Sequence, residues 1–269
     1  MGKFHTLFKL NTLAMDVAGI ALSVKRFPYF LKTKKYLKQN VEMKNLRKSD
    51  TCYVLGLGPS LKNVDVTKID GDIFTVNGFF NFKDASLVKP TVYCVVDTFG
   101  YTDPNDENIT KAMDMFPDST FLLNGLYRDI ALKKIGERKN KCFFSCAWSG
   151  YFRPEKEIDF TKNLPVMGNV VCHVIMAAMY MGYKKIVLLG CDFNSFASRK
   201  QAHCYEHAND ARSLRLSYEL FCYSFCADEH DLLAQYAKEH GVEIVNATNG
   251  SLIDAYRYDE SLVQYFMKG

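Results

Sequence analysis

The fold of this chain is decided by the stretch Tyr53-Val54-Leu55-Gly56-Leu57-Gly58-Pro59-Ser60-Leu61. It continues an apolar run that begins at Cys52 and is rich in residues that favour a β-strand. Gly56 and Gly58 have no Cβ, so the backbone can turn tightly and a ligand can approach the main chain. Pro59 suits the first turn of a helix. The stretch therefore predicts a strand, a glycine turn and the start of a helix.

A turn of this kind is suited to binding a nucleotide or a phosphate group. Backbone N–H groups at the start of a helix can bind an anion, the helix dipole adds to the attraction, and Ser60 supplies a hydroxyl. The third glycine of the dinucleotide fingerprint and the Gly-Lys-Ser/Thr of a P-loop are both absent. An ordinary strand-to-helix turn explains the stretch equally well, so this motif alone leaves both interpretations open.

From residue 51 onward, apolar strand-like segments alternate with helix-like segments. The predicted strands are residues 52–57, 72–77, 91–97, 120–124, 141–146, 185–190 and 242–246. The predicted helices are residues 108–116, 126–136, 168–182 and 211–240, the last being long enough for two helices. This alternation predicts an α/β, Rossmann-like, mostly parallel sheet of about seven strands with helices on both faces.

Polar residues follow most of the predicted strands. In parallel sheets, ligands bind beyond the carboxyl ends of the strands, which makes these residues candidates for a binding site. Asn and Asp are also common in turns, so their presence has a structural explanation as well. The candidates are Gly58, Pro59, Ser60, Asn77, Asp97, Asn124, Asp192, Asn194 and residues 246–249.

A histidine pair follows the predicted strand 185–190, in the sequence His203-Cys204-Tyr205-Glu206-His207. A neutral imidazole is the commonest general base near neutral pH, and loops above a sheet often carry one. A zinc site with cysteines 204, 222 and 226 is a second interpretation, and a solvated loop is a third. Of the other histidines, His173 is predicted to lie in the core, and His230 and His240 on the surface of the last long helix.

Charge and cysteine content limit the class of protein. Residues 1–50 carry a net charge of +8, and the other 219 of the 269 residues carry −4, which argues against a nucleic-acid-binding body. The nine cysteines are odd in number and often lie in apolar segments, which is typical of reduced thiols in a cytoplasmic protein. The sequence also shows no secretory signal.

We interpret residues 1–50 as a basic N-terminal arm and residues 51–269 as the catalytic domain. In the arm, apolar residues recur at helical spacing within residues 7–24, and residues 25–36 interleave cations with aromatic residues. The run is too short and too polar to span a membrane. We expect residues 1–45 to bind an anionic membrane surface, which would make the protein peripheral at the inner face of the cell membrane. Packing on the body or on a second subunit, as in a homo-oligomer, is the alternative.

Four segments in this order resemble the bacterial sialyltransferases of glycosyltransferase family 42. They are the Gly-x-Gly-Pro-Ser-Leu of residues 56–61, the Asp-Ile-Phe-Thr-Val-Asn of residues 72–77, the Met-Gly-Tyr-Lys-Lys-Ile-Val-Leu-Leu-Gly-Cys-Asp-Phe of residues 181–193, and the His-x-x-x-His of residues 203–207. They also resemble a wider group of domains related to the archaeal hydroxymethylpterin pyrophosphokinase. The resemblance covers about residues 51–256 and leaves the arm out.

The resemblance implies a site for the donor and a catalytic base. By matching position, its donor-binding residues would be Gly56, Gly58, Pro59, Ser60 and Asn77, with Asp97 in the place of an asparagine that contacts the donor. Gly168, Asp192, Asn194 and Tyr205 complete the predicted donor site. His207 matches the general base of the sialyltransferases. Only Gly168 remains of their Arg-x-Thr-Ser-Gly motif, and Tyr205 is the candidate to replace one of their two phosphate-binding tyrosines.

The implied function is glycosyl transfer in polysaccharide biosynthesis. The donor would be a nucleotide sugar, with a CMP-sugar favoured and sialic acid or a related sugar transferred, and the acceptor a cell-surface glycan or glycolipid. His207 would remove the proton of the acceptor hydroxyl in a direct displacement that requires no metal or other cofactor. One alternative is a Mg²⁺-dependent diphosphotransferase that uses Asp97 and Asp192. Another is a non-catalytic nucleotide-binding protein of the cell envelope.

Overall fold

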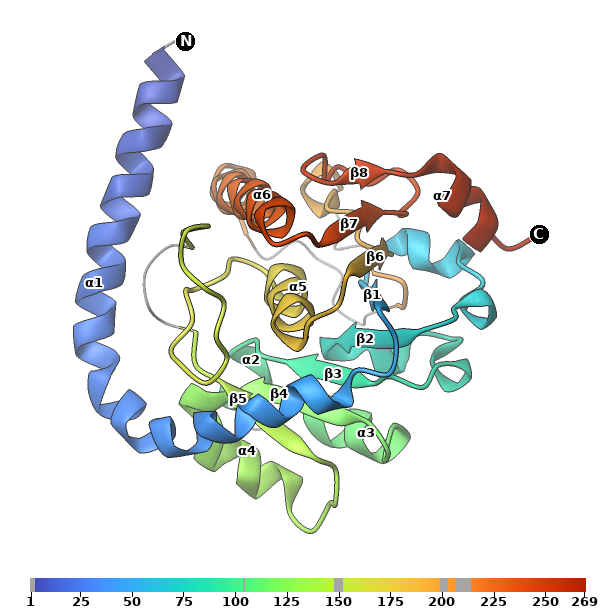
Figure 1. Cartoon of the computed structure of the whole chain (residues 1–269), viewed down its shortest axis with the longest axis horizontal. Helices are drawn as coiled ribbons and strands as arrows, with labels where there is room; N and C mark the ends of the chain where they lie inside the picture. The colour runs from blue at the N-terminus through green and yellow to red at the C-terminus, as the bar shows by residue number, and fades with distance from the viewer. Residues whose placement is uncertain (1–2, 104, 148–151, 199–202, 207–213) are drawn as a thin grey trace.

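The structure is a computed structural model that describes residues 3–103, 105–147, 152–198, 203–206 and 214–269. Its centre is a sheet of eight strands in the order β5-β4-β3-β2-β1-β6-β7-β8, and every neighbouring pair is parallel (Figure 1). The strands are β1 (Thr51–Leu55), β2 (Asp72–Val76), β3 (Val92–Val95), β4 (Thr120–Asn124), β5 (Cys142–Ser145), β6 (Lys185–Leu189), β7 (Glu243–Asn246) and β8 (Arg257–Tyr258). The predicted Rossmann-like α/β class is therefore confirmed, with β8 as an additional edge strand.

Helices cover both faces of this sheet. The α-helices are α1 (Lys3–Leu37), α2 (Phe99–Thr102), α3 (Asn108–Met115), α4 (Arg128–Ile135), α5 (Val170–Met181), α6 (Leu216–Glu239) and α7 (Glu260–Phe266). The 3₁₀ segments are η1 (Lys38–Leu46), η2 (Pro59–Asn63), η3 (Val66–Lys68), η4 (Asn77–Asn81), η5 (Ala85–Leu87), η6 (Gly125–Tyr127) and η7 (Ser195–Ala197). Residues 216–239 form one helix, where the sequence suggested two. α5 and α6 lie together on one face, and α3 and α4 lie together on the other.

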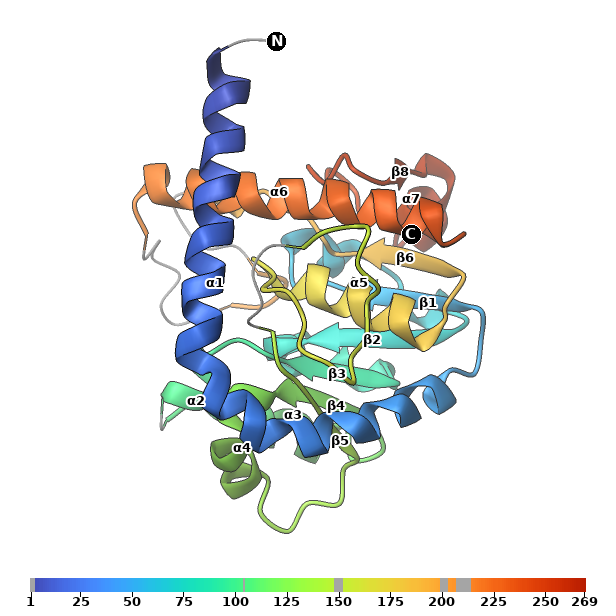
Figure 2. The same ribbon diagram turned by 60° about the vertical axis from the view of Figure 1, so that its left-hand side comes forward.

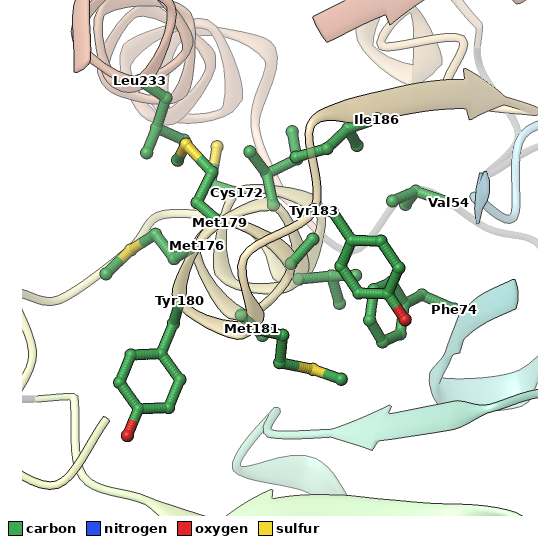
Figure 3. Close-up of a cluster of buried hydrophobic side chains, with 14 of the residues drawn as sticks. Val54, Phe74, Cys172, Met176, Met179, Tyr180, Met181, Tyr183, Ile186 and Leu233 are labelled. Carbon is green, nitrogen blue, oxygen red and sulfur yellow. The ribbon is translucent and has the colours of Figure 1, made fainter. Parts of the chain in front are cut away.

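The core is divided by the sheet, because alternate strand residues point to opposite faces. In β1, Val54 belongs to the cluster on the α5 face and Leu55 to the cluster on the opposite face. α5 is buried on nearly all sides, as its long apolar sequence predicts. Figure 3 shows α5 between Leu233 of α6 on one side and Val54, Phe74 and Ile186 of the sheet on the other. Phe74 and Tyr183 meet edge to face at 5.5 Å. The chain thereby holds the N-terminus of α5 at a fixed place above the central strands.

The N-terminal arm is longer and more integrated than the sequence indicated. α1 runs from Lys3 to Leu37 through Pro28, and its first half extends beyond the body (Figures 1 and 2). Its base is part of the core, since Leu37 and Met43 are buried. Asn40 Nδ2 donates to the carbonyl oxygens of Phe144 and Phe160, both at 2.8 Å. Within the described part of the chain, none of the helices is both long enough and apolar enough to cross a membrane.

Candidate functional site

A cavity of about 390 Å³ lies at the carboxyl ends of β1 and β6. The chain leaves β1 in one direction to form β2–β5 and returns on the other side to form β6–β8. A crevice at such a reversal is the usual ligand site of an open parallel sheet. The loops after β1 and β6, the N-terminus of α5 and one side of α6 line this cavity, which we call the central cavity.

The two glycines after β1 allow close contact between protein segments. Gly56 N and Gly58 N donate to the carbonyl oxygens of Leu189 and Gly190, both at 2.8 Å. A Cβ on Gly56 would lie 2.3 Å from Gly190 O, and a Cβ on Gly58 would lie 1.8 Å from Asp192 Oδ2. The sequence attributed these glycines to the approach of a ligand. In the structure, the loop after β6 already occupies the space beside them.

The helix expected after this loop is only η2, a five-residue 3₁₀ helix, so it provides little dipole. Its anion-binding groups are also engaged, because Asp192 Oδ1 accepts from Ser60 N at 3.1 Å and Oδ2 accepts from Ser60 Oγ at 2.7 Å. Burial raises the pKa of Asp192, and the bonds from Ser60 act in the opposite direction. The carboxylate of Asp192 thus occupies the position that the sequence assigned to a phosphate.

The N-terminus of α5 offers a second anion-binding position at the central cavity. Asn169 caps this helix by accepting a hydrogen bond from Cys172 N at 2.9 Å. Val170 and Val171 are its first two residues, and both line the cavity. The N–H groups of a helix's first turn have no partner within the helix, and a twelve-residue helix has a positive end here. The sequence held a signal for this position, since Asn before a long apolar helix is typical of an N-cap.

One side of α6 forms the opposite wall. Its lining residues recur at steps of one to four residues, which places them on one face of the helix: Glu219, Cys222, Tyr223, Cys226 and His230. His230 is 1% exposed, so the prediction that it lies on the surface is wrong. Its Nδ1 is 2.8 Å from the Tyr256 hydroxyl oxygen, and its Nε2 is 3.4 Å from Asn169 Nδ2. Burial lowers the pKa of His230 to about 4, so the ring is neutral at pH 7.

Two non-glycine residues beside the cavity have left-handed backbones. Asn77 has a φ of 42° and Phe193 has a φ of 55°. A non-glycine residue with a left-handed backbone raises the free energy of the folded state by of order 1–3 kcal/mol, and such conformations cluster at functional sites. Asn77 Nδ2 donates to Asp97 Oδ2, and the buried Asn77 Oδ1 has no partner among the described residues. The Tyr93 hydroxyl holds the turn by donating to Asn77 O at 2.6 Å.

Most of the predicted donor-site residues come together at this cavity. Those that line it are Gly56, Gly58, Pro59, Asn77, Gly168, Asp192 and Asn194. Ser60 and Asp97 lie behind the lining: Ser60 donates a hydrogen bond to Asp192, and Asp97 accepts one from Asn77. Tyr205 lies beside the lining, where its ring stacks on that of His203 at 5.2 Å and where a Cβ on Gly78 would lie 2.4 Å from its hydroxyl oxygen. His207 lies outside the described residues, but His203 lines the cavity.

Neither a protein-family model nor a curated protein matches the sequence. Solved structures of bacterial sialyltransferases match the fold. The sialyltransferase CstII from Campylobacter jejuni in complex with CMP-3FNeuAc aligns over 81% of this chain and 88% of its own, with a TM-score of 0.50 and 14% identity. The chain has the fold of this sialyltransferase. The monofunctional α-2,3-sialyltransferase Cst-I from Campylobacter jejuni aligns over 77% of this chain and 79% of its own, with a TM-score of 0.47 and 15% identity.

The sialyltransferase fold confirms one branch of the sequence resemblance, and the pterin-pyrophosphokinase branch stays a prediction. The central cavity has its own charge pattern. Its described lining includes the carboxylates Asp192 and Glu219 and no lysine or arginine. Within the residues that the structure describes, no group of three or more His, Cys, Asp or Glu is arranged to hold a metal ion. The interpretation of His203 and His207 as zinc ligands therefore gains no support from the described residues.

Sequence reasoning missed several residues of the central cavity. They are Asn169, Val170, Val171, Glu219, Tyr223 and His230. Asn169 could have been found from its capping position. The residues of α6 share a helical period, but that period does not reveal which side of α6 faces the ends of β1 and β6. Their role became visible only once the position of α6 was known.

Proposed function

We propose that this chain is a glycosyltransferase whose donor is a nucleotide-activated sugar, with a CMP-sugar favoured. The observation that carries the proposal is the central cavity, which opens at the reversal of strand order and combines the loop after β1 with the N-terminus of α5. Its volume is within the range of small-ligand sites. The CstII structure with CMP-3FNeuAc supports the choice of donor, because that protein shares the fold.

The charge of the cavity favours a donor with a single phosphate. Asp192 already engages the donors of Ser60, which leaves the N-terminus of α5 as the anion-binding position. A helix terminus suits one phosphodiester. A diphosphate would bring more negative charge to a lining that has two carboxylates and, among its described residues, no cation. We infer that the phosphate of the donor lies against the N–H groups of Val170 and Val171.

In the proposed reaction, an acceptor hydroxyl displaces the nucleotide from the sugar. The N–H groups at the N-terminus of α5 stabilise the negative charge that develops on the departing phosphate. His207 is proposed as the base that takes the proton of the acceptor hydroxyl, as the sequence resemblance implies. His230, buried at the cavity wall with its Nε2 3.4 Å from Asn169 Nδ2, would help to hold the residue that caps α5 in place. The acceptor is proposed to be a glycan or a glycolipid.

Replacement of Val170 by proline tests the anion-binding position. Proline is tolerated as the first residue of a helix and removes only the N–H group there, and Asn169 already has the extended backbone that must precede it. A hydrogen bond to a charged group contributes about 1.5–3 kcal/mol, so CMP affinity should fall roughly ten- to a hundredfold. Glu260→Pro, at the first residue of α7, is the matched control.

CMP affinity would be measured by calorimetry and thermal shift, beside UMP and ATP with and without Mg²⁺. Unchanged CMP binding by Val170→Pro would overturn the assignment to α5. Turnover then tests the base: His207→Ala should lose about two to four powers of ten in rate and keep its CMP affinity. Normal turnover would end the assignment of His207. Turnover with ATP that EDTA abolishes would instead favour the diphosphotransferase.

A further inference from the structure

One side of α1 carries an unusual row of exposed apolar side chains. Each is 53–72% exposed, and they recur at steps of three and four residues: Leu10, Leu13, Val17, Ile20, Val24, Phe27 and Leu31. This spacing places them on a single side of the helix, which we call the apolar stripe. The side that faces the body is different, since it includes the buried Gly19, Thr33 and Leu37. A contiguous exposed apolar surface of this length indicates an interaction site.

The charges around the apolar stripe indicate the kind of partner. Residues 17–41 contain no Asp or Glu, and their cations are Lys25, Arg26, Lys32, Lys34, Lys35 and Lys38. By helical position, Lys25 and Lys32 flank one side of the stripe and Lys34 flanks the other. A second copy of the chain would bring these cations against each other. An anionic lipid surface complements both the apolar stripe and its cationic flanks.

A second cavity lies at the base of this helix. It has a volume of about 820 Å³ and lies between the C-terminal half of α1 and the segment from η6 into α4, open to solvent on one side. We call it the arm cavity. Its lining includes four cations, Arg26, Lys32, Lys35 and Arg128, and the tyrosines 29, 36 and 127. Asp129 is the only acid among the described lining residues, and its carboxylate lies 3.6 Å from Arg128 Nη1. Its side chain is 89% exposed, so this ion pair is weak.

Arg128 is arranged to bind an anion in this cavity. Its guanidinium lies over the ring of Tyr36 at 3.4 Å and near the ring of Phe144 at 5.5 Å, so aromatic faces fix its plane. Its side chain is 19% exposed, and its Nε is buried without a hydrogen-bond partner among the described residues. The guanidinium donors form a planar fork that matches the oxygens of a phosphate group.

We propose that α1 lies on an anionic membrane with its apolar stripe in the lipid, and that the arm cavity binds the phosphate of a lipid headgroup through Arg128. η6 directly follows β4, and α1 contacts both η6 and β5, so the arm cavity lies on the same side of the sheet as the central cavity, beyond the carboxyl ends of the strands. Figure 2 shows α1 running along this side. If the proposed function holds, a glycolipid acceptor in the same membrane is presented to the side of the sheet that carries the donor.

Flotation of the full chain with vesicles tests the proposal without any donor or turnover. We expect binding to vesicles of phosphatidylcholine with 30% phosphatidylglycerol, at least tenfold weaker binding to pure phosphatidylcholine, and weaker binding as salt rises. Val24→Asp within the stripe should lower binding at least tenfold. Leu22→Asp is the matched control, because Leu22 is also exposed on α1 but lies off the stripe. Equal effects of the two substitutions would overturn the role of the stripe.

The arm cavity is tested separately. Arg128→Gln should lower binding to the anionic vesicles at least fivefold, and Lys133→Gln, which removes one exposed charge of the same helix, should lower it less than twofold. An unchanged far-UV circular dichroism spectrum shows that Arg128→Gln is folded. Because neither measurement uses a donor or turnover, the vesicle result is independent of the proposed function.

Two further measurements distinguish a membrane from the other possible partners, which are a soluble phosphate compound in the arm cavity and a second copy of the chain on the apolar stripe. Glycerol phosphate and inorganic phosphate at 10 mM should neither release the protein from vesicles nor stabilise it. Stabilisation by either one that disappears in Arg128→Gln, without vesicle binding by the native chain, would overturn the membrane proposal in favour of a soluble phosphate ligand. A dimer in solution that Val24→Asp dissociates would also overturn it, since the stripe would then join two copies.

Discussion

Glu229 should make the stability of the protein depend on pH in a way that one substitution removes. It lies on α6, is 3% exposed, and accepts a hydrogen bond from Gly168 N at 2.7 Å. Burial raises its pKa from 4.5 to about 8, and the bond from Gly168 offsets only part of this effect. Between these two pH values the folded protein keeps a proton that the unfolded chain has lost, so stability falls as pH rises.

The magnitude follows from the two pKa values. A tenfold change in proton affinity corresponds to about 1.4 kcal/mol, so a pKa of about 8 in place of 4.5 is worth roughly 5 kcal/mol. This contribution is fully present below pH 4.5 and is lost as pH rises through 8. Gln has the same shape, keeps an oxygen for Gly168 N and does not ionise. Glu229→Gln should therefore match the native protein near pH 4.5 and exceed its stability by about 2–5 kcal/mol at pH 8.5.

Urea unfolding at several pH values between 4.5 and 8.5 measures this difference. Subtracting the two curves removes contributions that both proteins share, including those of the buried histidines. Glu239→Gln is the matched control, because it makes the same replacement at an exposed position of the same helix. Parallel curves for Glu229→Gln and the native protein would refute the reasoning, because they would mean that Glu229 has the same pKa folded and unfolded.

Two further predictions concern contacts that fix the sheet. Gly58→Ala should lower the free energy of unfolding by about 1–3 kcal/mol, because its Cβ would lie 1.8 Å from Asp192 Oδ2. This loss should be smaller in an Asp192→Ala background, and additive effects in a double-mutant cycle measured by urea unfolding would contradict the prediction. Tyr183→Phe should lower the free energy of unfolding by about 1.5–3 kcal/mol, because it removes a 2.8 Å hydrogen bond to the buried carboxylate of Asp72. The control Tyr265→Phe, at an exposed tyrosine, should change the melting temperature by less than a degree.

The fold was predictable because the sheet is parallel and buried on both faces. Each strand then reads as a short apolar run, and seven of the eight strands were predicted from such runs. The exception, β8 (Arg257–Tyr258), has two exposed residues and therefore no apolar pattern. The N-terminal helix was predicted to end at Val24, but Phe30, Thr33 and Leu37 pack on the body and stabilise α1 beyond Pro28. Tertiary packing of this kind cannot be read from local propensity.

The candidate site was predictable only where its residues follow strands. Asn77 and Asp192 were found in this way, because a strand end has a fixed place in a parallel sheet. The contact of the glycine loop with Asp192 was not predicted, because this carboxylate comes from 132 residues away to bind Ser60. His230 was missed for a related reason. Its burial depends on Phe193 and Tyr256, and no local pattern links these residues.

The hydrogen bonds of Asn40 also determine when the base of the arm can pack against the body during synthesis. Its acceptors, Phe144 and Phe160, follow it by 104 and 120 residues. A ribosome adds about 5–20 residues per second, so the base of the arm waits roughly 5–25 s for its binding place to emerge. During that interval Leu37 and Met43 have no core to enter. A membrane near the ribosome would therefore meet the arm before the sheet exists, and the order of synthesis would place attachment ahead of folding.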